Sequence, residues 1–560
     1  LPLEKLRCSA AKTAMHALPR ALGDACRALG LDVQKDMDGY KIMMKMCKPR
    51  PKRQGDLPGI TWHDNRADLD RLYRYCMRDV EAEESLSQAL RDLPEKELEI
   101  WQLDQVINER GIQADLEACR AMLNMVSIHE EQLLGRLTWL TRGAVKSAKQ
   151  VYQLINYLRG LGVDLPDLSS ASVKEALNGD INDTARDILR IRASLGRSSS
   201  AKYQSIIDRS SSDGRVRGAL LYHGAATGRW SGAGIQPQNF PSRIKVSADP
   251  EEMLDTIMAG GLELHNALYE DDPMATAGAV TRSILMAKEG HELMVADYAA
   301  IEGRGLAWLA GEETELDIYR EGRDIYIETA AKILGKPYDQ VTKDERQSPG
   351  KISVLACGYQ GGVGAVRKFG GDGMTDDEIK EQIVRPWRDA HPMTVKFWRD
   401  LEDACMSAVQ EPGKVFTCRA VSFRVQDKFL MCRLPSGRLL FYYDPQVMPM
   451  KTSWGESKEC VTYMTVDSMT RKWVRTNTYG GKLAENITQA VCRDLMAEAM
   501  LRVEKAGYPI VLTVHDELVC EIPEGFGSVE EFCGIMCEVP SWAKGFPIKA
   551  EGWRGKRYRK

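Results

Sequence analysis

The sequence predicts a mixed α/β protein built from several domains. Its 560 residues exceed what one hydrophobic core usually supports, so domains of about 100–200 residues each are expected. Residues 95–205 have strongly helical patterning, whereas strands and helices alternate from Arg215 onward. Residues 415–474 are rich in Val, Phe, Tyr and Thr and predict a β-rich insertion.

The composition is that of an ordinary globular chain, with 43% hydrophobic and 28% charged residues. This excludes a collagenous, low-complexity or wholly disordered protein. No apolar run approaches the ~20 residues of a membrane-spanning helix, and no basic-then-apolar leader is expected from the opening residues. The 14 cysteines include no CxxC pair, so free thiols in a reducing cytoplasm are expected. The start at Leu1, without a Met, suggests a fragment.

The first 205 residues are expected to be helical. Residues 11–29 carry apolar side chains at helical spacing, and residues 48–59 form a loop rich in Pro, Gly, Lys and Arg. Residues 147–159 predict an amphipathic helix. Polar breaks at 198–200 and 210–214 separate this half from the rest of the chain.

An acid ends the first clear strand of the second half. Residues 292–296 are an apolar run suited to a buried strand, Asp297 follows directly, and residues 301–309 return to helical spacing. Side chains at strand ends in α/β sheets are commonly displayed for catalysis.

Two further strands, 508–514 and 518–522, meet at a turn of His515, Asp516 and Glu517. Tight hairpins usually favour Gly or Asn, so acids framed by apolar strands call for a compensating cation. The alternative is a solvated turn. Together with Asp297, these carboxylates could hold two Mg²⁺ ions for phosphoryl transfer.

A third candidate is the helix expected to start at Ser348–Pro349 and stop at Gly361–Gly362. Lys351, Leu355 and Tyr359 are four residues apart and would share one face. That face could bind a triphosphate and stack a base, although the spacing alone favours an ordinary amphipathic helix.

The motifs together resemble a known family. Residues 295–304 (VADYAAIEGR) resemble motif A of the family A DNA polymerases, residues 351–361 resemble motif B, and VHDE at 514–517 resembles motif C. YHGAATGRWS at 222–231, followed by QPQNFP at 236–241, resembles the template–primer-binding segment. The resemblance covers residues 95–560, and the wording around the motifs is similar to phage members.

The resemblance implies roles for the matching residues. Asp297 and Asp516 would be catalytic carboxylates that bind two Mg²⁺ ions, for which Mn²⁺ could substitute, with the Tyr298 carbonyl as a further ligand and Glu517 in support. Glu302 would be the steric gate against a ribose 2′-hydroxyl. The residues implied to bind the nucleotide are Glu302, Tyr326, Arg346, Lys351, Leu355 and Tyr359. Those implied to contact primer or template are Lys202, Arg229, Gln238, Asn239, Gln489, Arg493 and His515.

Two positions depart from the family pattern. Relatives carry an Arg four residues before the motif B Lys, whereas this chain has Gln347 there and Arg346 one residue earlier. Tyr326 stands where bacterial repair enzymes have a phosphate-contacting His. A tyrosine donates a hydrogen bond but adds no positive charge, so weaker triphosphate binding is expected.

Tyr75 and Asp79 fit the Tyr-x-x-x-Asp pattern of the 3′–5′ exonuclease domain attached to many of these polymerases. Residues 1–74 contain no Asp-x-Glu, which that domain needs on its first strand. A partial RNase H-like domain without proofreading is therefore expected.

The resemblance implies a right-hand architecture. Its expected divisions are a partial exonuclease domain (1–92), a connector (93–114), a thumb (115–205), a first palm segment (206–309), fingers (310–410) and a second palm segment (411–560).

The expected activity is template-directed DNA polymerisation, for phage replication in a bacterial cytoplasm. The expected partners are a DNA primer–template and dNTPs, with the chain acting as a monomer, away from membranes and with any processivity factor unidentified. The alternatives are a single-subunit RNA polymerase, which Glu302 disfavours, and a non-catalytic DNA-binding relative, which the paired carboxylates disfavour. A nuclease would have to rest on residues 1–92.

Overall fold

The computed structural model describes residues 2–56, 58–196, 200–241, 244–371, 373–451 and 457–559. Two stretches of the sequence predictions lie outside these residues: Ser198 and Ser199 of the polar break, and positions 452–456 of the β-rich insertion. The mixed α/β class is confirmed, since helices and four separate sheets make up the chain's described regions.

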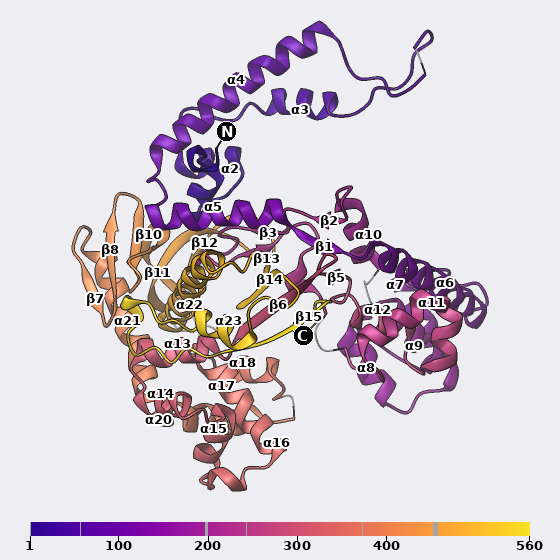
Figure 1. Cartoon of the computed structure of the whole chain (residues 1–560). Helices are drawn as coiled ribbons and strands as arrows, with labels where there is room; N and C mark the ends of the chain where they lie inside the picture. Colours follow the sequence, from indigo (N-terminus) through magenta and orange to yellow (C-terminus); the bar gives the residue numbers. More distant parts are fainter. Residues whose placement is uncertain are drawn as a thin grey trace.

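Residues 2–92 fold into helices and loops, and the described portion of this region contains no strand. The predicted helical stretch 11–29 is divided in two, because Ala17 has a positive φ and Pro19 follows. In Figure 1, α3 and α4 project away from the rest of the molecule. The elements are η1 (Leu3–Lys5), α1 (Ser9–Met15), α2 (Leu22–Leu29), α3 (Met37–Met46) and α4 (Arg66–Ala89).

A long connecting helix, α5 (Glu95–Arg110), leads from this region to a helical bundle. Asp115 and Asn182 cap two of its helices by accepting bonds from backbone N–H groups. The bundle extends beyond the thumb boundary expected at residue 205, because α11 packs against α6 and α12 packs against both. Its helices are α6 (Leu116–Leu140), α7 (Val151–Gly160), α8 (Ser170–Asn178), α9 (Asp183–Leu195), α10 (Ser200–Arg209), α11 (Pro250–Leu268) and α12 (Pro273–Ala279).

Short strands join this bundle to the central sheet. A three-stranded sheet has the order β2-β1-β5, and β3 pairs with β4 in a small hairpin. The 3-10 turn η2 (Pro237–Asn239) follows β4. The strands are β1 (Ile112–Ala114), β2 (Arg215–Val216), β3 (Leu220–Leu221), β4 (Ser231–Gly232) and β5 (Leu285–Met286).

The central sheet has four antiparallel strands in the order β13-β14-β6-β15. The strands predicted at 292–296, 508–514 and 518–522 are all present in it. Residues 293–296 are buried, as expected for a continuous apolar run. The elements are β6 (His291–Tyr298), β13 (Ile510–Val514), β14 (Glu517–Pro523) and β15 (Ala550–Gly555), with α22 (Gly480–Lys505), α23 (Val529–Met536) and η6 (Ser541–Ala543).

The segment between β6 and the next large sheet is helical and lies low in Figure 1. The helix predicted at 301–309 is confirmed as α13. The elements are α13 (Ile301–Ala310), α14 (Glu313–Arg320), α15 (Ile325–Leu334), η3 (Tyr338–Gln340), α16 (Lys343–Glu345), η4 (Arg346–Lys351), α17 (Ile352–Cys357), α18 (Val363–Lys368), α19 (Asp376–Ile379), η5 (Lys380–Val384), α20 (Arg385–Ala390) and α21 (Pro392–Gln410).

The helix predicted from Ser348 to Gly361 is shorter than expected. Ser348 has non-helical backbone angles within the π-helical turn η4, and α17 ends at Cys357. The chain then folds tightly over the end of α17, since a Cβ on Gly361 would lie 1.9 Å from the Ala356 carbonyl oxygen. Tyr359 therefore lies in a turn, and the predicted helical face shared with Lys351 and Leu355 is wrong.

The predicted β-rich insertion is confirmed as a six-stranded antiparallel meander, β12-β11-β10-β9-β8-β7. α21 packs against this sheet, and residues from α1, α2 and α4 pack with its apolar side chains. The strands are β7 (Phe416–Cys418), β8 (Val421–Gln426), β9 (Phe429–Arg433), β10 (Leu439–Lys451), β11 (Ser457–Val466) and β12 (Trp473–Asn477).

One large hydrophobic cluster runs through the central sheet, α22 and the bases of the two helical regions. A separate cluster fills the outer end of the bundle around α7 and α9. Within the described ranges, no helix is both long and apolar enough to cross a membrane.

Candidate active site

Two predicted catalytic carboxylates lie on neighbouring strands of the central sheet. Asp297 is the penultimate residue of β6, and Asp516 lies in the turn between β13 and β14, where His515 has a positive φ of 57°. The Tyr298 amide donates a hydrogen bond to the Asp516 carbonyl at 3.2 Å, and Glu517 stands opposite Asp297 in the strand register. The fold thus brings Asp297, Tyr298 and Asp516 to one edge of the sheet.

An arginine links this edge to the predicted steric gate. Arg229 donates from Nη2 to Asp516 Oδ1 at 3.0 Å and from Nη1 to Glu302 Oε1 at 2.6 Å. Tyr359 Oη donates to the other Glu302 oxygen at 2.9 Å. Burial raises the pKa of the Asp516 carboxyl, while the adjacent Arg229 guanidinium acts to lower it. Residues from four distant segments therefore form one hydrogen-bonded chain.

The donor set fits a hard divalent cation. Carboxylate oxygens and a backbone carbonyl are the ligands that Mg²⁺ prefers, and Asp297, Asp516 and Tyr298 offer them together. The Arg229 guanidinium beside Asp516 shows that positive charge is stabilised at this edge. Across the described residues, no group of three or more His, Cys, Asp or Glu side chains forms a complete metal site.

Glu517 occupies a different environment from Asp516. Its side chain is 2% exposed and accepts a hydrogen bond from Tyr558 Oη, which in turn accepts from Arg282 Nη1 at 2.8 Å. These contacts connect the hairpin to the C-terminal segment after β15.

The predicted nucleotide-binding residues of the fingers gather around Tyr326. The Arg346 guanidinium lies 5.0 Å from the Tyr326 ring centroid, and Lys351 Nζ lies 5.9 Å from it. Arg346 Nε also donates to Asp324 Oδ2 at 2.8 Å. Arg346 thus lies near the same tyrosine ring as Lys351 despite its shifted sequence position. Leu355, on α17, is 42% exposed.

Several predicted DNA-contacting residues form a surface beside the hairpin. Gln238 Nε2 donates to the Thr513 carbonyl at 3.0 Å, and His515 Nε2 lies 3.2 Å from the Gln238 carbonyl oxygen. Lys202 Nζ donates to the Asn239 carbonyl at 2.5 Å. The turn η2 is thereby held against the edge that carries Asp516.

Arg493 is not on this surface, which corrects its prediction as a direct DNA contact. Its side chain is 1% exposed, makes a bidentate ion pair with Glu97 and donates from Nε to the Gly228 carbonyl at 3.1 Å. A guanidinium with these bonds has no face available to DNA. Gln489, one turn earlier on α22, is partly exposed and donates to Glu485 at 3.4 Å.

Sequence reasoning missed the acids of α5. Glu97 and Asp104 are both buried and lie two helical turns apart, in the same stripe as Ile100, Trp101 and Ile107. Acids at apolar-stripe positions are the signal that could have identified them, because buried carboxylates need specific partners.

The exonuclease-like pair lies far from this edge, on α4. Tyr75 is buried, and Lys35 Nζ is 3.0 Å from Asp79 Oδ2 and 5.3 Å from the Tyr75 ring centroid. A lysine therefore neutralises the carboxylate that the exonuclease pattern would use for metal binding.

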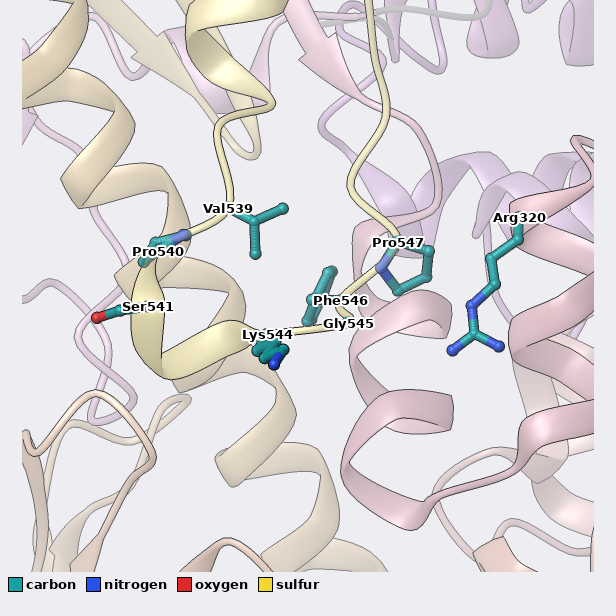
Figure 2. Close-up of a pocket in the computed structure, with 8 residues that line it drawn as sticks. All are labelled: Arg320, Val539, Pro540, Ser541, Lys544, Gly545, Phe546 and Pro547. Carbon is teal, nitrogen blue, oxygen red and sulfur yellow. The ribbon is translucent and has the colours of Figure 1, made fainter.

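Figure 2 shows a pocket of about 550 Å³ between Arg320 of α14 and the segment from Val539 to Pro547. Its lining is mostly Pro, Gly, Val and Phe, with Arg320 and Lys544 as the charged side chains. None of the residues predicted for the active site lines it.

Comparisons with known proteins agree with the geometry. The family model described as DNA polymerase family A matches residues 145–359. The chain is 34% identical over 564 residues to the DNA polymerase of Bacillus phage SP02, covering 99% of this chain and 85% of the relative. It is 25% identical over 271 residues to the thermostable DNA polymerase I of Thermus aquaticus, covering 47% of this chain and 27% of that protein.

Among solved structures, the POL domain of Pol1 from M. smegmatis, in complex with DNA primer-template and dNTP, matches with a TM-score of 0.62. The match has 17% identity and covers 98% of this chain and 81% of that one. The expected right-hand fold of palm, fingers and thumb is thereby confirmed. The fold, the family-model match and the near full-length similarity to the phage enzyme together show that the chain belongs to DNA polymerase family A.

Proposed function

We propose that this DNA polymerase extends a DNA primer with dNTPs by using Asp297 and Asp516 to bind divalent metal ions. The observation that carries the proposal is the pairing of these carboxylates, from segments far apart in the chain, at one edge of the central sheet. Bound Mg²⁺ would activate the primer 3′-hydroxyl and neutralise charge on the phosphates. The similarity to the Bacillus phage enzyme supports a role in phage DNA replication.

The fingers residues supply the nucleotide's counter-charges. Lys351 and Arg346 carry positive charge beside Tyr326, and a triphosphate is the anion that such a cluster fits. Glu302, fixed between Arg229 and Tyr359, blocks the space that a ribose 2′-hydroxyl would need. Selection of dNTPs over rNTPs is therefore assigned to Glu302.

The surface around η2 holds the primer–template. Gln238 and Asn239 lie directly beside the hairpin that carries His515, and Lys202 adds positive charge. Arg229 neutralises Asp516 and Glu302, which keeps their carboxylates close together.

Primer extension with Mg²⁺ tests the proposal, with dNTPs and rNTPs offered separately. We expect extension with dNTPs only, and a loss of about a thousandfold or more in Asp516→Ala, because a metal-binding carboxylate is removed. Glu524→Ala, an exposed acid just beyond β14, is the matched control and should retain full activity. Extension by Asp516→Ala at the wild-type rate would refute the assignment, and efficient use of rNTPs would favour an RNA polymerase.

We also propose that residues 1–92 do not proofread. The ion pair between Lys35 and Asp79, and the lack of any strand among the described residues of this region, support this. A 3′-mismatched primer incubated with Mg²⁺ and no dNTPs should keep its length. Shortening of the primer that persists in Asp516→Ala but disappears in Asp79→Ala would show that these residues do form an exonuclease.

A further inference from the structure

The loop that carries Arg229 is closed on itself and packed tightly. Residues 222–230 connect β3 to β4, whose register pairs Leu221 with Ser231. Gly228 has a φ of 93°, and a Cβ there would lie 2.7 Å from Arg438 Nη1. Only glycine combines this backbone angle with that close approach. The residue immediately before Arg229 is therefore fixed by its neighbours.

Helix α5 holds this loop at both ends. Tyr222 Oη donates to Glu97 Oε2 at 2.6 Å, and Trp230 Nε1 donates to Asp104 Oδ1 at 2.9 Å. Asn108, one turn beyond Asp104, both donates to and accepts from the Leu220 backbone. Residues seven apart on a helix lie on nearly the same face, so one side of α5 presents both carboxylates to the loop.

Two buried arginines hold the carbonyls at the tip of the loop. Arg493 Nε donates to the Gly228 carbonyl at 3.1 Å, and Arg438 Nη2 donates to the Thr227 carbonyl at 2.8 Å. Glu97 accepts two bonds from Arg493, and Asp494 accepts from Arg438 Nε at 2.6 Å.

The charges of this cluster balance. Burial acts to raise the pKa of Glu97, but the adjacent Arg493 guanidinium lowers this pKa below its ordinary value. Each buried charge has an opposite partner, which is the condition under which buried ion pairs persist. Buried ion pairs of this kind contribute little net stability, and we interpret these pairs as fixing the position of the groups that they bind.

Arg229 is the residue of this loop that contacts the candidate active site. Its guanidinium donates hydrogen bonds to Asp516 and Glu302. Its backbone lies between Gly228, held by Arg493, and Trp230, held by Asp104. A displacement of either neighbour would move the guanidinium. Small displacements of positioning groups cost large factors in rate, because reacting groups must be aligned.

We propose that Asp104 and Glu97 of α5 are positioning residues that set the location of Arg229 at the catalytic carboxylates. This inference rests on the proposed function, in which Arg229 neutralises Asp516 and Glu302. Helix α5 would thus contribute to catalysis through the loop that carries Arg229, rather than through a hydrogen bond of its own to Asp297 or Asp516.

A double-mutant cycle on single-turnover primer extension tests this. Asp104→Leu removes the acceptor for Trp230 and should lower the extension rate about tenfold or more. Asp104→Asn keeps an oxygen acceptor and should stay within about twofold of wild type. In an Arg229→Ala background, Asp104→Leu should have no further effect, since its action passes through Arg229.

Ile107→Ala is the matched control, because Ile107 is buried on the same helix face without contacting the loop by a polar bond. It should lower the melting temperature but leave the rate within about twofold. If Asp104→Leu does not fold, Trp230→Phe removes the same hydrogen bond from the other side. If Asp104→Leu lowered the rate by the same factor in the wild-type and the Arg229→Ala backgrounds, this inference would be overturned and the proposed function would stand. A wild-type rate in Arg229→Ala would instead refute the role of Arg229 in the proposed function.

Discussion

Asp104 is a carboxyl group enclosed by hydrogen-bond donors. Its side chain is 1% exposed and accepts from Trp230, Asn108 and Gln105, with Arg20 as the nearby positive charge. Burial raises its pKa to about 7 despite these partners. An acid with a raised pKa in the folded state binds protons that the unfolded chain releases, so folding is favoured at low pH.

The consequence is a pH-dependent stability carried by this residue. The contribution is fully present below the ordinary Asp pKa of about 4 and is lost as pH rises through about 7. Over that interval it amounts to about 4 kcal/mol. We expect the free energy of unfolding of wild type, relative to Asp104→Asn, to fall between about pH 4 and pH 7 and then to level off.

Urea unfolding at several pH values checks this, because all other titrating groups are common to both proteins. Asp68→Asn is a suitable control, since its carboxylate pairs with Lys45 at the surface of the N-terminal helices. A difference between wild type and Asp104→Asn that is constant from about pH 5 to about pH 8 would contradict the prediction.

At the same scale, the sequence pattern predicted the local structure around the two candidate aspartates. Asp297 stands near the end of β6 and Asp516 lies in the turn between β13 and β14, as the apolar runs before them indicated. It failed for Arg493, because a motif cannot show that Glu97, almost 400 residues away, pairs with it. The role of a polar residue depended on tertiary partners that local spacing does not encode.

Among the elements, α21 depends on a cap from a different helix region. Its N-terminal residue Pro392 is followed by Met393 and Thr394, whose amides donate to Glu312 Oε2 at 3.0 and 3.3 Å. Glu312 is buried, and no side-chain cap comes from His391. A carboxylate there satisfies two free N–H groups and the positive end of the helix dipole.

Glu312→Ala should therefore destabilise the protein by about 1–2 kcal/mol, since two buried amides lose their acceptor. Thermal and urea unfolding measure this. Glu313→Ala, at the neighbouring exposed acid, should change stability by less than about 0.5 kcal/mol. Equal effects of the two substitutions would show that the cap contributes nothing.

The elements were predictable where their patterns were long or apolar. The palm strands, the β-rich insertion and α13 follow from alternation and apolar runs. The bounds of the motif B helix were not predictable, because Ser348 interrupts η4 and the glycines after Cys357 allow a tight turn. Helix ends depend on backbone angles that residue type only biases.

At the scale of the whole molecule, the N-terminal helices pack against the rest of the protein. Met15 of α1 lies in one apolar cluster with Trp101 of α5 and Phe441 of the six-stranded sheet. Arg20 Nη1 also donates to the Tyr222 carbonyl at 2.6 Å, at the start of the Arg229 loop. Residues 2–92 thus contact the polymerase region directly.

Met15→Ala should lower the free energy of unfolding of the main cooperative transition by about 2–5 kcal/mol, through lost burial and a cavity. Met77→Ala on α4 is the matched control, because Met77 is 65% exposed whereas Met15 is 5% exposed. Its effect should stay below about 0.5 kcal/mol. A main transition unchanged by Met15→Ala would mean that the N-terminal helices unfold separately.

The arrangement of domains came from family resemblance more than from pattern. Nothing in local spacing shows that α11 and α12 join the bundle around α6, since that depends on long-range packing. The joint order of the three motifs carried the fold prediction, because together they imply one known topology.

The central strand β6 (His291–Tyr298) pairs with β14 and β15, which both come far later in the chain. A ribosome therefore releases β6 well before either neighbour is made, and both edges of a buried apolar strand wait unpaired in the nascent chain. Pairing across so long a separation is a late folding event. In the proposed function, a nascent chain that stops before residue 510 has Asp297 but lacks Asp516, and therefore lacks half of the metal site.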